Sequence, residues 1–222
     1  MNNNLSFYMN YLKLNTSLVM VLMILLNQHL IFSQTNDCGQ AILTNAWFEK
    51  HPELKIKYDA IQVQKLQELN PLNNSKKSIV STPTYTIPVV FHVLHLGGIE
   101  NISDAQIVDQ VAILNRDYQK KNADTAVITS TFTNNIANVG FAFELASIDP
   151  DGNCTNGIVR HYTYKTNWDA NNLDEFVFSW PTDRYLNIYI VKTININATA
   201  YTFLPGIGIP PNADVIVAMH NM

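Results

Sequence analysis

The stretch IPVVFHVLH, residues 87–95, decides how the rest of the chain is interpreted. It is rich in valine and has Pro88 near its start, which is typical of a β-strand. Side chains in a strand alternate between two faces, so His92 and His95 point to opposite sides and cannot bind one metal ion together. On a helix the same spacing would favour half of a metal site. We expect a buried strand with a hydrogen-bonded core His92 and with His95 at its end.

The segment after this strand, ENISDAQIVDQVAILNRDYQKKN (100–122), predicts the clearest helix in the chain, over residues 103–120. Ser103 and Gln106 have the spacing of a capping box, and Ile102 fits the hydrophobic staple around that cap. The apolar positions recur at helical spacing, which predicts one buried stripe. The residues of this stripe are Ile107, Val111, Leu114 and Tyr118.

Four later stretches predict further strands, because they are rich in β-branched and aromatic residues and are bounded by turn residues. They are residues 139–148, 157–164, 185–191 and 214–220. A strand, a helix and then several strands predict an α/β or α+β fold.

The amino-terminal region predicts an exported protein. Lys13 is the only charged residue in the first 36, and it precedes the apolar run 17–26. This pattern is typical of a signal peptide over residues 1–34, which implies a secreted or extracellular protein. A retained anchor is the alternative, although the apolar run is short for a stable membrane span. The net charge of −4 gives no basic patch for nucleic acid.

Composition divides the rest of the chain into three parts. Residues 35–70 predict a small helical segment, with Pro52 at a first helical position. Residues 71–84 are rich in Asn, Ser, Pro and Lys and predict a linker, and residues 85–222 form the main domain. The apolar stripe expected on the helix after Pro52 is Leu54, Tyr58, Ile61, Leu66 and Leu69.

Known catalytic motifs are absent from the sequence, including phosphate loops, CxxC pairs, GxSxG and HExxH. The histidines have no metal-ligand spacing, so we expect no catalytic residue and no metal ligand in this chain. The stretch DPDGNCTNG (149–157) begins like an EF-hand loop. However, Cys154 replaces the required glycine and Arg160 replaces the required glutamate, so we expect a turn.

Cys38 and Cys154 are the two cysteines of the chain. They allow one disulfide in an oxidising compartment, and a bond from Cys38 to a cysteine outside this chain is a further alternative. A third interpretation is that the Cys38 thiolate blocks a catalytic zinc ion and keeps a protease latent, because thiolate is a strong zinc ligand. The sequence leaves these interpretations open.

Several motifs in one order resemble a known family. They are YTIPVVFHVLH, NISDAQIVDQVAILNRDY, DPDGNCTNGIVR, RYLNIYIV and DVIVAMH. Together they resemble the amino-terminal part of the pappalysin-type metzincins, the zinc metallopeptidases that include pregnancy-associated plasma protein-A. The resemblance implies a zincin-like twisted mixed sheet with a backing helix at 103–120, preceded by a helical pro-segment. It also implies Cys38 as the zinc-blocking residue.

The family's catalytic helix carries HExxHxxGxxH, which supplies three zinc ligands and a general base, and it follows a strand that DVIVAMH resembles. That helix is missing from the 222 residues. The resemblance therefore implies an incomplete protease that is inactive and binds no zinc as given, and that needs zinc and a peptide substrate at full length. The alternatives are a non-catalytic secreted binding protein with the same sheet, and an unrelated α/β enzyme.

Overall fold

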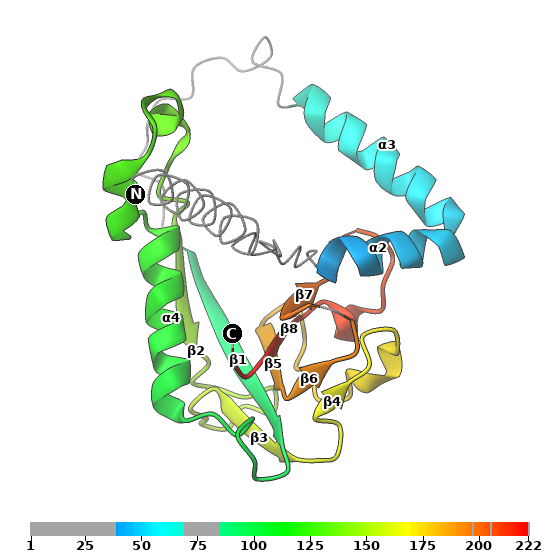
Figure 1. Ribbon diagram of the computed structural model, residues 1–222, viewed down its shortest axis with the longest axis vertical. Helices are drawn as coiled ribbons and strands as arrows, with labels where there is room; N and C mark the ends of the chain where they lie inside the picture. The colour runs from blue at the N-terminus through cyan, green and yellow to red at the C-terminus, as the bar shows by residue number, and fades with distance from the viewer. Residues whose placement is uncertain (1–38, 69–84, 197, 205, 222) are drawn as a thin grey trace, which may run out of the picture. The chain divides into compact units, whose positions relative to one another are not determined.

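A computed structural model describes residues 39–68, 85–196, 198–204 and 206–221. The strand predicted from the opening stretch is present as β1 (Tyr85–His95), and its residues from Val89 to Leu94 are buried. β1 lies in the middle of a six-stranded sheet (Figure 1). The predicted central strand is therefore confirmed.

β1 has partners on both edges. On one edge it pairs in succession with β2 (Phe141–Leu145) and β3 (Ile158–Tyr162), both parallel. On the other edge it pairs with β5 (Leu186–Val191), which pairs with β8 (Ile216–Met219), again in parallel. The antiparallel strand β7 (Ala200–Thr202) completes the sheet beyond β8. The sheet is thus mixed, as predicted, with one antiparallel strand at its end.

Two residues explain how β1 is accommodated in this sheet. Pro88 has no N–H to donate. At this position along the strand an N–H would point toward β5, and the pairing of β1 with β5 begins only at Val89. Gly157 lies where β1 changes partner from β2 to β3, with φ at 72°. A Cβ atom there would lie 2.7 Å from the Ala146 nitrogen, so this close approach requires glycine.

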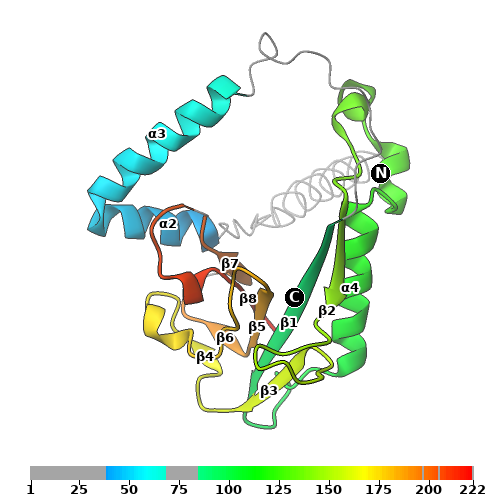
Figure 2. The ribbon, with the colours of Figure 1, turned by 180° about the vertical axis from the view of Figure 1, so that it is seen from behind.

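The helix α4 (Asp104–Tyr118) covers one face of the sheet (Figures 1 and 2). Its capping box is formed as predicted: the Gln106 N–H donates to the Ser103 hydroxyl, and the Ser103 N–H donates to the Gln106 side chain. The predicted stripe is only partly buried. Ile107 is fully buried, but Tyr118 is 44% exposed, because a groove lies open beside the helix.

The opposite face of the sheet packs against loops and short strands that the sequence did not predict. β4 (Asn167–Trp168) and β6 (Thr193–Ile194) form a two-stranded parallel pair. Trp168 is buried there, and its indole N–H donates to the Tyr201 hydroxyl at 2.7 Å. Short 3-10 turns lie at Ala123–Val127, Ser130–Asn135, Leu173–Glu175 and Pro211–Ala213.

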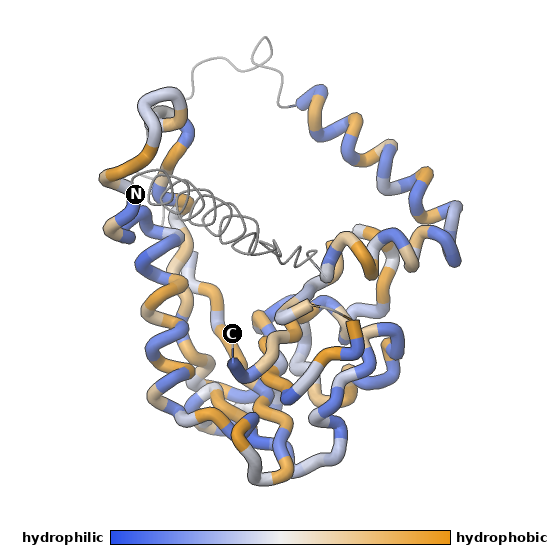
Figure 3. The backbone as a smooth tube through the Cα atoms, in the orientation of Figure 1, coloured by the Kyte–Doolittle hydropathy of each residue, from blue (hydrophilic) through white to orange (hydrophobic). Residues whose placement is uncertain are grey.

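Two helices precede the sheet. They are α2 (Gly39–Lys50) and α3 (Pro52–Glu68), and Pro52 begins α3 as predicted. Polar and apolar residues alternate along α3 (Figure 3), yet it buries no residue. The predicted stripe is therefore wrong in its second half: Leu66 is 69% exposed, because nothing in the described structure packs against that end of the helix.

Some predictions fall outside the described residues. These are the signal peptide, the linker, Cys38 and the stripe position Leu69. Among the residues that are described, no helix is both long and apolar enough to cross a membrane.

Candidate functional site

The most buried polar cluster in the described structure forms around His92. This side chain is fully buried on the face of the sheet opposite α4. One ring nitrogen, Nδ1, lies 3.1 Å from Nε2 of His161 on β3, and the other, Nε2, lies 2.9 Å from Oδ1 of Asn187 on β5. Strand pairing thus joins three polar residues that are far apart in the sequence.

The orientation of Asn187 determines which hydrogen each histidine carries. Its amide nitrogen donates to the Trp180 and Tyr185 carbonyl oxygens, and its Oδ1 accepts from the Trp180 N–H. Oδ1 must therefore also accept from Nε2–H of His92, which leaves Nδ1 of His92 as an acceptor for Nε2–H of His161. The cluster is a directed chain of hydrogen bonds.

The two histidines of this hydrogen-bonded cluster, His92 and His161, are neutral near pH 7. Burial lowers the pKa of His92 from 6.5 to about 4, and the Asn187 bond opposes this change only in part. Burial also lowers the pKa of His161 to about 4, and the nearby His95 adds to the effect. The ring of His161 stacks on Phe178, with centroids 3.9 Å apart. The arrangement fits a satisfied core histidine, as predicted for His92.

His95 does not join this cluster. Its Nδ1 accepts a hydrogen bond from the Gly97 N–H at 3.1 Å, and its ring contacts Tyr162 edge to face. His92 and His95 thus have different partners, as expected for side chains on opposite faces of β1. The sequence did not reveal the partnership of His92 with His161, because 69 residues separate them.

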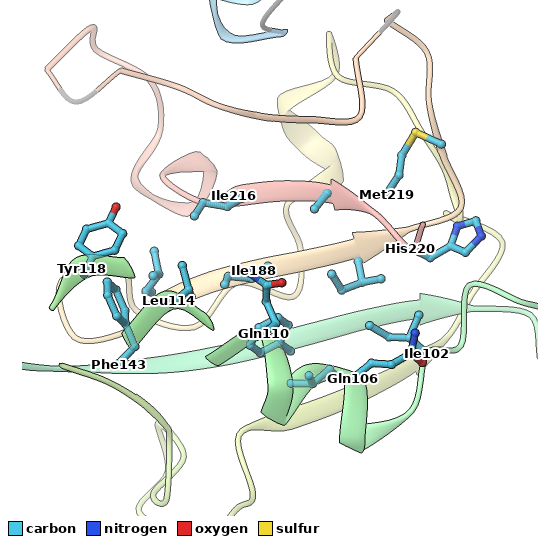
Figure 4. Close-up of a pocket in the computed structure, with 15 residues that line it drawn as sticks. Ile102, Gln106, Gln110, Leu114, Tyr118, Phe143, Ile188, Ile216, Met219 and His220 are labelled. Carbon is cyan, nitrogen blue, oxygen red and sulfur yellow. The ribbon is translucent and has the colours of Figure 1, made fainter. Parts of the chain in front are cut away.

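The second candidate site is an apolar groove between α4 and the strands β5 and β8 (Figure 4). Its volume is about 280 Å³. Tyr118 and Phe143 lie at one end, and His220 and Ile102 lie at the other. Its wall is formed mainly by isoleucine, leucine and alanine side chains, namely Ile107, Leu114, Leu186, Ile188, Ile190, Ile216 and Ala218.

Few polar groups border this groove. They are Gln106 and Gln110 of α4, the Tyr118 hydroxyl, and the imidazole of His220, whose buried Nδ1 has no hydrogen-bond partner in the described part of the chain. The described residues place no acid–base pair in the groove. It is suited to packing against an apolar element rather than to chemistry of its own.

The loop after β2 is a turn, as predicted. Asp149 accepts hydrogen bonds from the backbone N–H groups of Asp151 and Asn153, and these bonds lower the pKa of its carboxyl group. The carboxylate is therefore occupied by its own loop, as in an Asx turn. Cys154 in this loop is exposed, and Cys38 lies outside the described residues, so their disulfide stays a prediction.

Solved structures similar to this chain include three of mirolysin and its pro-form. Mirolysin in complex with a compound and mature mirolysin of Tannerella forsythia in complex with a cleaved peptide are each 37% identical, with a TM-score of 0.57. Each match covers 62% of this chain and 53% of mirolysin. A promirolysin mutant of T. forsythia is 33% identical, with a TM-score of 0.65 over 82% of this chain and 59% of promirolysin.

These matches support a relation to the metzincin-type metallopeptidases and a fold shared with the pro-form and the mature enzyme. The chain spans just over half the length of those proteins. No protein-family model and no curated protein sequence matches it. Within the described ranges, no three His, Cys, Asp or Glu side chains come together, so these residues do not fit the zinc ion that such an enzyme needs.

Proposed function

We propose that this chain is the amino-terminal part of a secreted zinc-dependent metalloendopeptidase of the pappalysin type, made with a pro-segment. The observation that carries this proposal is the similarity to promirolysin, at 33% identity over 82% of the chain. The resemblance of the strand and helix motifs from 85 to 220 to the pappalysin-type enzymes supports the narrower family assignment.

The pro-segment assignment has its own support. The match with promirolysin covers 82% of this chain, whereas the matches with mature mirolysin cover 62%. The helices α2 and α3 precede the sheet, where a segment removed on maturation is expected. We therefore propose that residues 35–70 correspond to the pro-segment, with a linker over 71–84.

The substrate of the full-length enzyme is proposed to be a protein or peptide, because mature mirolysin is seen with a cleaved peptide. Zinc in the full-length enzyme would polarise the scissile carbonyl and activate water. The residues of this chain do not provide that site, so we expect the chain as given to be inactive.

The groove beside α4 fits this proposal. Its apolar wall includes β8, which resembles the strand that the family's catalytic helix follows. A helix that carries the zinc ligands would bury this wall, which otherwise leaves apolar surface exposed to water. The groove is equally a place for an unrelated partner if the protein is a non-catalytic binding protein, which is the alternative function.

Cys38 is proposed to be the cysteine that blocks the zinc ion in the latent enzyme. The competing interpretation is a disulfide with Cys154, which is exposed and accessible to a partner. Peptide mapping without reduction distinguishes the two: a linked pair of peptides supports the disulfide, and free thiols at both positions rule it out.

The experiment that tests the proposed function begins with the coding DNA beyond the codon for Met222. We expect HExxHxxGxxH within a few dozen codons, in frame or one shift away. The extended protein should then cleave a peptide substrate and lose this activity with a chelator or with a Glu→Ala substitution in the new motif. A stop codon without this motif in any frame would overturn the proposal and favour the binding protein.

A further inference from the structure

The helix α2 is anchored in the main domain by its side chains. Leu43 and Phe48 are 4% and 9% exposed and belong to the hydrophobic core that also contains Trp168 and Tyr201. Trp47 packs against the same core, and its indole N–H donates to the Ile207 carbonyl oxygen at 2.9 Å. Trp47 is partly buried, and an aromatic side chain that packs on a core while its polar group is hydrogen-bonded is typical of an anchor.

The surface that receives α2 is formed by the strand β7 and by loops on either side of it, and we call it the α2 seat. It comprises Ala170, Leu173, Ala200, Phe203 and Ile207. α2 contacts β7 (Figures 1 and 2). At Gly39 a Cβ atom would lie 3.1 Å from the Ala200 carbonyl oxygen, so the approach is close along the start of the helix.

The neighbouring helix α3 is held in a different way. It buries no residue, and Ile56 and Leu66 are 73% and 69% exposed. Its first turns contact the main domain through Leu54 beside Gly208, and they contact α2 through Tyr58, whose ring lies 5.5 Å from that of Phe48. α2 therefore supplies the main attachment of the two helices.

We propose that α2 is a docking helix that stays bound to the α2 seat after the chain is cut between α3 and β1. This inference rests on the proposed function, in which these helices belong to the pro-segment. Removal of the pro-segment then takes two steps, first the cut and then the dissociation of α2. The second step is slow, because it exposes Leu43, Phe48 and Phe203 to water.

One residue limits the strength of this docking. Thr44 of α2 is 6% exposed, and its hydroxyl has no hydrogen-bond partner in the described part of the chain. A buried hydroxyl without a partner opposes binding, and valine has the same shape without that group. Thr44→Val is therefore expected to slow dissociation, whereas Trp47→Ala is expected to accelerate it.

The test uses the full chain with the recognition sequence of a site-specific protease placed within residues 71–84. After complete cleavage, size-exclusion chromatography and mass spectrometry show whether the two pieces elute together. We expect co-elution in native buffer and separation only in denaturant. Trp47→Ala should raise the dissociation rate by about tenfold or more, Thr44→Val should lower it, and the exposed control Leu66→Ala should leave it unchanged.

Separation of the wild-type pieces directly after the cut would overturn the inference. An equal effect of Trp47→Ala and Leu66→Ala would also overturn it. If the uncut Trp47→Ala chain does not fold, Thr44→Val and its slower dissociation provide the comparison. These measurements need neither zinc nor peptidase activity, so a failure of docking is distinguishable from a failure of the proposed function.

Discussion

His92 is buried at the centre of the sheet, and both of its ring nitrogens have partners. Asn187 is the residue on which this arrangement depends, because its amide group bonds to His92 and to the backbone on both sides of Pro181. Buried polar networks stabilise a fold only when each member is paired. Substitution of Asn187 should therefore lower the free energy of unfolding by more than its hydrogen bonds contribute to it.

Asn187→Leu is expected to lower the free energy of unfolding by about 3 kcal/mol or more, since it leaves the His92 N–H and the Trp180 N–H without an acceptor. Chemical denaturation monitored by circular dichroism measures this change. The exposed Asn171 provides the matched control, and Asn171→Leu should change stability by less than about 0.5 kcal/mol. Equal effects of the two substitutions would contradict the role given to Asn187.

Stability should also fall on acidification, because of the same cluster. In the folded chain His92 has a pKa of about 4, whereas in the unfolded chain it is near 6.5. Between these values the unfolded state binds more protons, so the free energy of unfolding decreases as pH falls from 6.5 to 4. The contribution of His92 is fully present above about pH 7 and amounts to roughly 3 kcal/mol.

Denaturation curves between pH 7 and pH 4 check this prediction. His92→Gln should reduce the slope of stability against pH, whereas His51→Gln, whose ring lies outside the cluster, should leave it unchanged. Protonation of carboxylates such as Asp149 also lowers the stability of the folded protein in acid, because hydrogen bonds lower the pKa of this group in the folded state. The comparison of the two variants separates the histidine contribution from theirs.

At the scale of elements, α4 shows how local sequence fixes a boundary. The Ser103 hydroxyl accepts from the Gln106 N–H, and Ile102 packs in the same apolar cluster as Ile107. Loss of the cap leaves one of the first N–H groups of the helix unpaired. The capping box therefore stabilises the helix that covers the sheet.

Ser103→Ala is expected to destabilise the protein by about 1 kcal/mol, because the first turn of α4 loses its acceptor. Thermal unfolding followed by circular dichroism would show a lower midpoint. Ser103→Asp restores an acceptor at the cap and should recover most of the loss. A midpoint unchanged by Ser103→Ala would show that the cap contributes nothing to stability.

Local patterns predicted the long elements, and the reason is physical. β1, α4 and β5 have enough residues for alternation or a capping box to be visible in the sequence. β4, β6 and β7 have two or three residues each and depend on contacts such as Trp168 with Tyr201, which no short window contains.

The candidate sites were harder to predict from the sequence than the short strands. His92 and Asn187 meet although 95 residues separate them, because β1 and β5 pair in parallel. The groove beside α4 is a property of the packed sheet and helix, and its isoleucines looked like ordinary core positions in the sequence. What the sequence did predict was the opposite orientation of His92 and His95, since that follows from alternation alone.

At the scale of the whole described domain, the two faces of the sheet differ. One face is covered by the aromatic core around Trp168 and by α2. The other face is covered by α4 but retains the groove of about 280 Å³ along β5 and β8. Well-packed protein interiors contain few spaces of this size. We therefore expect the packing of the 222-residue chain and of the proposed extended protein to differ most at this groove.

Ala218 of β8 lines this groove, and Ala218→Leu tests whether the groove is open or covered. In the 222-residue chain the larger side chain should fill empty space and raise the free energy of unfolding by about 1 kcal/mol, with weaker binding of an apolar dye. In the extended protein a helix over the groove would leave no room, so the same substitution should destabilise by about 1–3 kcal/mol. Denaturation of both lengths gives the two values. If Ala218→Leu changes the free energy of unfolding in the same direction in both proteins, no element covers this face. That result would favour a non-catalytic protein that uses the groove for a partner.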